Sequence, residues 1–167
     1  REREPPLQET VDAFEELRAA GKIKRWGVSN FDVDNMNELL SLEHGRKCAA
    51  NQVLYNLENR EIEFDLLPWS QTNKIPIMAY SPVGHSGKLL RNAALKKIAQ
   101  SHNATPAQIA LAWVLRQSNV IAIPKASTDA HVRDNAASLK IKLAKEDLID
   151  LDGEFPPPKS RKSLPML

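Results

Sequence analysis

The chain has 167 residues, of which 42% are apolar and 26% are charged, with a formal net charge of +2. This composition fits one globular domain and not a disordered tail, and the small net charge shows no basic surplus that would suggest nucleic acid as a partner. Cys48 is the only cysteine, which excludes an internal disulfide and a cysteine-based zinc site and favours a reducing, cytoplasmic compartment.

No membrane segment or signal peptide is expected. The longest apolar run, residues 109–115, is far shorter than the roughly 20 residues that span a bilayer. The first residues, Arg-Glu-Arg-Glu-Pro-Pro, lack the apolar core of a secretion signal. His44, His85 and His102 do not have metal-ligand spacing, so no metal site is expected.

Short apolar runs alternate with amphipathic segments in the first half of the chain. Apolar residues at helical spacing predict a helix from about Leu7, ending at Gly21, which suits a left-handed cap. A strand at 23–29 follows, and then a helix capped by Asp32. We expect a second strand at 49–55 and a helical segment at 61–74, which Pro68 interrupts by opening a second piece.

The alternation continues in the second half. We expect strands at 75–80 and 120–123, and helices at 91–101, 105–117, 129–139 and 145–153. Thr105, Pro106 and Gln108 form a capping-box start, and Ser127 or Thr128 caps the helix at 129–139. The helical patterns also place Trp69 and Trp113 in the core.

Strands separated by helices of this length predict parallel βαβ units and therefore the α/β class, with about four parallel strands. Four such units form either half of a (β/α)8 barrel or a small open sheet. A whole barrel usually needs about 250 residues. In barrels the carboxyl ends of the strands carry function, so the four expected strand ends are the places to search for a site.

Each of these strands carries a polar motif. Gly-Val-Ser-Asn-Phe lies at 27–31, Asn-Gln-Val at 51–53, Tyr-Ser-Pro-Val-Gly at 80–84 and Ile-Pro-Lys-Ala at 123–126. In this order and spacing they resemble the aldo-keto reductase signatures GVSNF, NQV, YSPLG and IPKS. The resemblance covers nearly the whole chain. It implies that residues 1–167 are the C-terminal half of one TIM barrel of the aldo-keto reductase type, with the N-terminal half absent.

The resemblance assigns cofactor contacts to the first three motifs. Ser29, Asn30 and Gln52 would hydrogen-bond the nicotinamide carboxamide, which needs both donors and acceptors. Tyr80 would stack on the nicotinamide ring. Ser81 and Gly84 would wrap the pyrophosphate through hydroxyl and backbone N–H groups.

The fourth motif and the helix after it would bind the adenosine end. Lys125 would pair with the 2′-phosphate, and Ser127 lies in the same loop. His131 and Asn135 share one helix face, which in the family meets adenosine. His131 stands where many members carry an arginine, and Ala126 replaces a serine. The implied cofactor is NADPH, with NADH as the alternative.

The catalytic Tyr, Lys, Asp and His of the family come from the first half of the barrel, and none of their motifs is in this chain. Its only tyrosines, Tyr55 and Tyr80, match other positions of the family pattern. No catalytic residue is therefore assigned, and whether the chain alone is an enzyme stays open. The resemblance implies NADPH-dependent reduction of aldehydes or ketones by the complete protein, with a small carbonyl compound as substrate.

The alternative is a non-catalytic half-barrel that binds nucleotide or a partner. In either case the missing N-terminal half is the expected partner. Without it, two strands become open edges, and an inner face that includes Val28, Val53 and Ile121 or Ala122 is uncovered. We therefore expect the isolated half to associate with itself.

Overall fold

A computed structural model describes residues 5–167, and its centre is a parallel sheet of four short strands. The strands are β1 (Val28–Ser29), β2 (Asn51–Leu54), β3 (Ile77–Tyr80) and β4 (Val120–Ala122). They pair in chain order, β1-β2-β3-β4, and helices lie in every connection between them. The prediction of an α/β fold with four parallel strands is confirmed.

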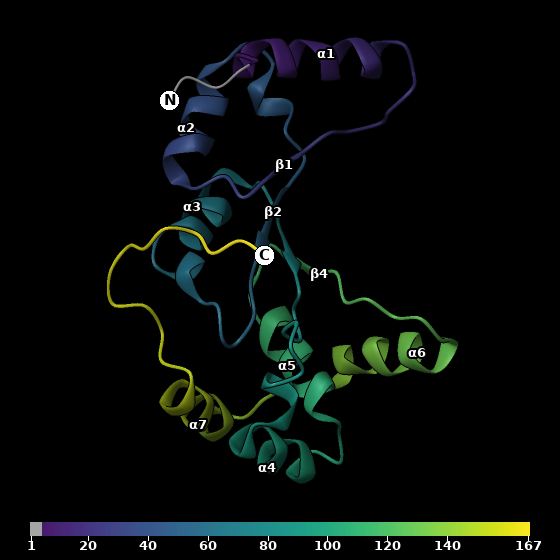
Figure 1. Ribbon diagram of the computed structural model, residues 1–167, viewed down its shortest axis with the longest axis vertical. Helices are drawn as coiled ribbons and strands as arrows, with labels where there is room; N and C mark the ends of the chain where they lie inside the picture. Colours follow the sequence, from purple (N-terminus) through teal and green to yellow (C-terminus); the bar gives the residue numbers. More distant parts are fainter. Residues whose placement is uncertain (1–4) are drawn as a thin grey trace.

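The helices begin close to the predicted positions. They are α1 (Leu7–Ala19), α2 (Val33–Ser41), α3 (Leu66–Asn73), α4 (Ala93–Ser101), α5 (Pro106–Leu115), α6 (Asp129–Ala137) and α7 (Lys145–Glu154). Figure 1 shows α1 and α2 at one end of the molecule and α4 and α7 at the other, with the strands between. No helix in residues 5–167 is long and apolar enough to cross a membrane.

Local signals explain where several helices begin. The Asp32 side chain accepts a hydrogen bond from the Asn35 backbone N–H at 2.9 Å and caps α2. Thr105 and Gln108 close the predicted capping box of α5. Thr128, and not Ser127, caps α6, because its side chain accepts from the His131 N–H at 3.2 Å. Gly21 adopts the left-handed φ of +70° after α1.

Two predicted bounds were wrong. The strand expected at 23–29 is regular only at Val28–Ser29. Within residues 5–167, β1 pairs with β2 alone, so only the residues that lie opposite β2 form strand hydrogen bonds. The break expected at Pro68 comes earlier. The chain makes a 3-10 turn at Glu61–Glu63, and α3 starts at Leu66, so Pro68 lies in its first turn. There a missing N–H costs no intrahelical hydrogen bond.

The core lies between the helices and one face of the sheet. Helix α5 runs through its middle, with six consecutive buried residues from Ile109 to Val114. Trp113 is fully buried, and its ring centroid lies 5.2 Å from that of Tyr55, with the two rings tilted by 40°. Trp69 was wrongly placed in the core. It is half-buried, and its indole N–H donates to Asn37 Oδ1 at 2.9 Å, joining α3 to α2.

The opposite face of the sheet has no helix over it in residues 5–167. Ser29, Gln52, Met78 and Ile121 form one row across the four strands on this open face. Ile121 is 48% exposed. The residues of the alternate face, such as Val53 and Ala79, are buried against helices. The prediction that Val28 and Val53 lie on the open face was therefore wrong. Of the alternatives Ile121 and Ala122, Ile121 lies on the open face and Ala122 on the helix side.

Candidate functional site

Ser29, Asn30 and Gln52 lie together where β1 and β2 end. The Ser29 hydroxyl donates to the Gln52 carbonyl at 3.0 Å, and the Asn30 N–H donates to the same oxygen at 2.8 Å. Asn30 has a left-handed φ of +57°. Its Oδ1 atom is buried and finds no hydrogen-bond partner anywhere in the described residues. A buried acceptor of this kind normally has a donor, so it is open to a ligand N–H.

Asn51, which the motif contains but which we did not assign a role, holds the same loop from the other face of the sheet. Its side chain is 1% exposed. Its Nδ2 donates to the Phe31 carbonyl at 2.7 Å, and its Oδ1 accepts from the Phe31 N–H at 3.4 Å. The sequence gives one sign of this role. Asn51 is next to Gln52 in the strand, so its amide side chain points to the opposite face of the sheet, into the core.

The loop after β3 contains the second group of expected contacts. Tyr80 is half-buried, and Ser81 follows it with a left-handed φ of +47°. Gly84 has a φ of +74°, and its N–H donates to the Ser81 carbonyl at 2.9 Å. A Cβ on Gly84 would lie 3.2 Å from the Leu89 Cβ. This position needs glycine for both its conformation and its space.

A second buried asparagine supports this loop, and it too was missed. Asn56 is fully buried, and its Nδ2 donates to the Ser81 carbonyl at 2.9 Å. Its Oδ1 accepts from the backbone N–H groups of Glu58 and Asn59 at 2.9 and 3.0 Å. Both ends of the Asn56 side-chain amide are therefore bonded to backbone groups of the surrounding loops.

The adenosine-end residues lie on the loop after β4 and on α6. Lys125, Ser127 and His131 are exposed, and Asn135 is half-buried. The strand order fixes their place. Ser29 and Gln52 lie on β1 and β2, and Asn30 directly follows β1. The Tyr80–Gly84 segment begins at the last residue of β3, and Lys125 follows β4. The structure thus brings the first group together and arranges the others in chain order along the same edge of the sheet.

Of the two tyrosines, Tyr80 has the strand parity of Met78 and so belongs to the open face, whereas Tyr55 does not. Tyr55 is fully buried on the helix side, and its hydroxyl donates to Glu63 Oε1 at 2.6 Å. Burial and the neighbouring Glu63 carboxylate raise the pKa of Tyr55 above its ordinary value, although Arg116 opposes this. Tyr80 is the residue expected to stack on a ring. No group of three His, Cys, Asp or Glu within residues 5–167 is arranged to hold a metal ion.

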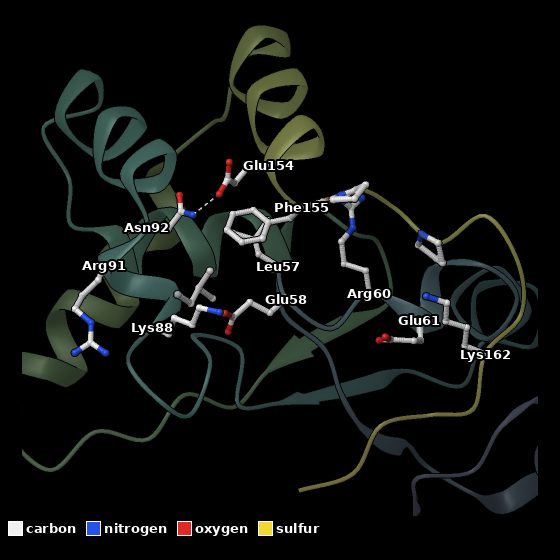
Figure 2. Close-up of a pocket in the computed structure, with 13 residues that line it drawn as sticks. Leu57, Glu58, Arg60, Glu61, Lys88, Arg91, Asn92, Glu154, Phe155 and Lys162 are labelled. Atoms are coloured by element: carbon white, nitrogen blue, oxygen red, sulfur yellow. Dashed lines mark hydrogen bonds between the residues drawn. The ribbon is translucent and has the colours of Figure 1, made fainter.

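Two hollows lie near these residues. A shallow one of about 440 Å³ on the open face is bordered by Trp26, Ser29, Gln52 and Met78. A groove of about 710 Å³ lies between the loops after β2 and β3 and the tail after α7 (Figure 2). Side chains of both signs line this groove, and Figure 2 shows Glu58 and Lys88 pointing toward one another across it. The sequence motifs gave no indication of the groove.

Arg60 forms one wall of the groove. It is 6% exposed and pairs with Glu63 at 2.7 Å and with Asp152 of α7 at 2.8 Å. It also donates to the Phe155 carbonyl. Because these partners satisfy the guanidinium, Arg60 joins α7 to the loop after β2 and is not available to a ligand.

Comparison with known proteins decides the family. The model of the aldo/keto reductase family matches residues 2–153. This chain belongs to the aldo/keto reductase family. It is 51% identical to the methylglyoxal reductase YeaE of Escherichia coli (strain K12) over 165 residues, which are 96% of the chain and 58% of that relative. It is 35% identical to a glyoxal reductase of Bacillus subtilis (strain 168), covering 87% of the chain and 51% of the relative.

Solved structures agree. A crystal structure of an aldo/keto reductase from Klebsiella pneumoniae in complex with NADP and acetate has 48% identity and a TM-score of 0.93. The match covers 97% of this chain and 59% of that one. The chain therefore spans little more than half the length of the family members that it matches.

Proposed function

We propose that this chain is the cofactor-binding half of an NADPH-dependent reductase that converts aldehydes or ketones to alcohols. The observation that carries the proposal is the cluster at the ends of β1 and β2. Asn30 Oδ1 is a buried acceptor with no partner in residues 5–167, beside Ser29 and Gln52. A nicotinamide carboxamide has an NH2 group to fill that acceptor and a carbonyl to accept from the Gln52 amide.

The remaining expected contacts fit the other parts of NADPH. The turn from Ser81 to Gly84, in which both residues have a left-handed φ, would meet the pyrophosphate. Exposed Lys125 would pair with the 2′-phosphate, with Ser127, His131 and Asn135 around the adenosine. When bound, NADPH supplies a hydride to the carbonyl carbon, while a proton from a protein acid completes the alcohol.

That acid would come from outside this chain. Tyr55 is fully buried, and Tyr80 would stack on the cofactor ring. We propose that the chain is the C-terminal half of a (β/α)8 barrel, and that the other half supplies the catalytic Tyr, Lys, Asp and His. Three features support this: the consecutive parallel strands, the uncovered face with Ile121 at 48% exposure, and the 58% coverage of the E. coli relative.

The substrate would be a small carbonyl compound. Two of the relatives are named for the reduction of methylglyoxal and glyoxal, which are small carbonyl compounds. The protein would work in the cytoplasm, where the thiol of its buried Cys48 stays reduced.

The first test is binding of NADPH to the 167-residue chain, followed by calorimetry or by nicotinamide fluorescence. The wild-type chain is expected to bind, and Ser29→Ala together with Gln52→Ala to weaken binding by tenfold or more, at about 1.4 kcal/mol per factor of ten. Ser41→Ala, an exposed serine on α2, is the matched control and should bind normally. Absence of NADPH binding by a folded wild-type chain would overturn the proposal.

The second test is turnover. The chain alone should not oxidise NADPH in the presence of methylglyoxal, because it lacks the acid. Adding the part of the E. coli relative that this chain does not match should restore turnover. Sustained turnover by the chain alone that vanishes in Tyr80→Phe or Tyr55→Phe would show that one of these tyrosines is the acid.

A further inference from the structure

Two loops at the carboxyl edge of the sheet contain a residue other than glycine in the left-handed region. They are Asn30, with a φ of +57°, and Ser81, with a φ of +47°. This region is unfavourable for L-residues, and for serine more than for asparagine, so such a conformation persists only where the surroundings hold it. In both loops the neighbouring backbone is held by one buried asparagine from β2 or from the residues just after it.

Asn51 holds the first loop. Its amide pairs with both polar groups of the Phe31 backbone, as donor to the carbonyl at 2.7 Å and as acceptor from the N–H at 3.4 Å. Phe31 directly follows Asn30, so this pairing fixes the peptide on one side of the left-handed residue. The Asn30 N–H, bonded to the Gln52 carbonyl at 2.8 Å, fixes the other side.

Asn56 holds the second loop in a comparable way. Its Nδ2 donates to the carbonyl of Ser81 itself at 2.9 Å, and the Gly84 N–H donates to the same oxygen at 2.9 Å. The Asn56 Oδ1 is fixed by two backbone N–H groups, from Glu58 and Asn59. With both ends of its amide engaged and no exposure, Asn56 has no freedom to release Ser81.

We propose that Asn51 and Asn56 are positioning residues for the cofactor site, each setting one left-handed turn. This inference rests on the proposed NADPH site and extends it to residues that would not touch the ligand. Asn51 would set Asn30, which would meet the carboxamide, and Asn56 would set the Ser81–Gly84 turn, which would meet the pyrophosphate. The two asparagines would therefore control different parts of the same ligand.

Aspartate tests this arrangement because it has the shape of asparagine but cannot donate from the second side-chain position. Three probes separate the parts of the ligand: NADPH, 2′-phospho-ADP-ribose, which lacks nicotinamide, and adenosine 2′,5′-bisphosphate, which also lacks the pyrophosphate link. Asn51→Asp is expected to weaken NADPH about tenfold and leave the other two unchanged. Asn56→Asp is expected to weaken NADPH and 2′-phospho-ADP-ribose about tenfold and leave adenosine 2′,5′-bisphosphate unchanged.

Asn119 provides a matched control. It is also left-handed, with a φ of +65°, and its Nδ2 donates to the carbonyls of Ser70 and Ile75 at 2.9 and 3.1 Å. It directly precedes β4 and so lies at the amino edge of the sheet, opposite the proposed site. Asn119→Asp loses the same kind of hydrogen bond and is expected to bind all three probes like the wild type. If all three variants weaken all probes alike, the asparagines are structural only and the proposal fails.

Amide hydrogen exchange tests the positioning without any ligand. In Asn51→Asp the Asn30 amide should exchange about tenfold faster, and in Asn56→Asp the Gly84 amide should do so, while amides inside β3 keep their rates. Wild-type exchange at both amides would overturn the positioning roles. The wild-type chain could bind none of the three probes while the two variants still show the expected exchange rates. In that case the proposed function fails, but Asn51 and Asn56 still position the two left-handed turns.

Discussion

Arg161 in the C-terminal tail lies 2.8 Å from Asp34 near the start of α2, measured between Nη2 and Oδ2. Its Nε also lies 3.1 Å from Asp65 Oδ2, just before α3. In Figure 1 the yellow tail leaves α7 and passes α3 on its way back toward the strands. The single arginine therefore ties the tail to α2, the helix that follows the Ser29–Phe31 loop.

We expect Arg161→Ala to release the tail without unfolding the chain. All three side chains are partly exposed, so water screens these contacts and they should contribute little to global stability. Trypsin should cut after Lys159 and Lys162 several times faster in the variant, as followed by mass spectrometry. Lys97→Ala is the control. It removes an exposed ion pair between Lys97 of α4 and Asp150 of α7 and should leave these cuts unchanged. Equal cutting rates in the wild type and Arg161→Ala would show that the contacts of Arg161 with Asp34 and Asp65 do not hold the tail in place.

The buried Tyr55 predicts a loss of stability in alkali. Burial and the Glu63 carboxylate raise the pKa of Tyr55, so the folded chain holds the phenol proton to a higher pH than the unfolded chain. The unfolded phenol ionises near pH 10, and the free energy of unfolding should therefore fall as the pH rises above about 10. Tyr55→Phe should remove this part of the slope and cost about 1–2 kcal/mol at neutral pH through the lost hydrogen bond. Urea unfolding of the wild type and the variant at pH 8 and above pH 10 measures the cost of the lost hydrogen bond and the fall in stability with pH. If the variant loses as much stability with rising pH as the wild type, another group is responsible.

The choice between NADPH and NADH should depend on Lys125. On the proposed function its exposed ammonium pairs with the 2′-phosphate that NADH lacks, so Lys125→Ala should lower the ratio of NADPH to NADH affinity about tenfold. His131→Arg should raise the ratio, because guanidinium adds a fixed charge and several donors. Titration of each variant with both cofactors gives the ratio. Lys142→Ala, an exposed lysine beyond α6, should leave it unchanged, and a ratio unaffected by loss of Lys125 would remove Lys125 from the site.

The isolated chain is expected to associate with itself. In residues 5–167, β1 and β4 are the outer strands of the sheet, and Ile121 on the open face is 48% exposed. Unpaired strand edges beside apolar side chains favour edge-to-edge pairing. Analytical ultracentrifugation should therefore show dimers or larger species at tens of micromolar, and Ile121→Lys should shift the distribution toward monomer. A monodisperse wild-type monomer that unfolds cooperatively would contradict the half-barrel proposal and favour a self-contained open sheet.

The parts of the fold that sequence reasoning predicted are those decided by neighbouring residues. The Thr105–Gln108 capping box and the Asp32 cap each involve residues three positions apart, so their pattern is visible along the chain. The regular length of β1 was not predictable in this way, because it depends on which residues face β2. Trp69 was misplaced for a related reason: its half-exposed position depends on the contact with Asn37, 32 residues away.

The same distinction applies to the candidate site. Ser29, Gln52 and Lys125 were found because motifs mark the ends of strands. Asn51 and Asn56 were missed as supports because their partners, Phe31 and Ser81, lie 20 and 25 residues away. A buried amide in a strand has no local signature that tells which distant carbonyl it bonds.

The pairing of the four strands in chain order has a consequence for protein engineering. The proposed adenosine contacts, from Lys125 to Asn135, come from one uninterrupted stretch of sequence that begins after the outer strand β4. The stretch from β4 through α6 could be transplanted from a relative that prefers NADH as a single cassette, without redesigning β1 and β2. Recombination at the α5–β4 junction would thus allow coenzyme preference to be inherited independently of the residues that orient the reacting ring.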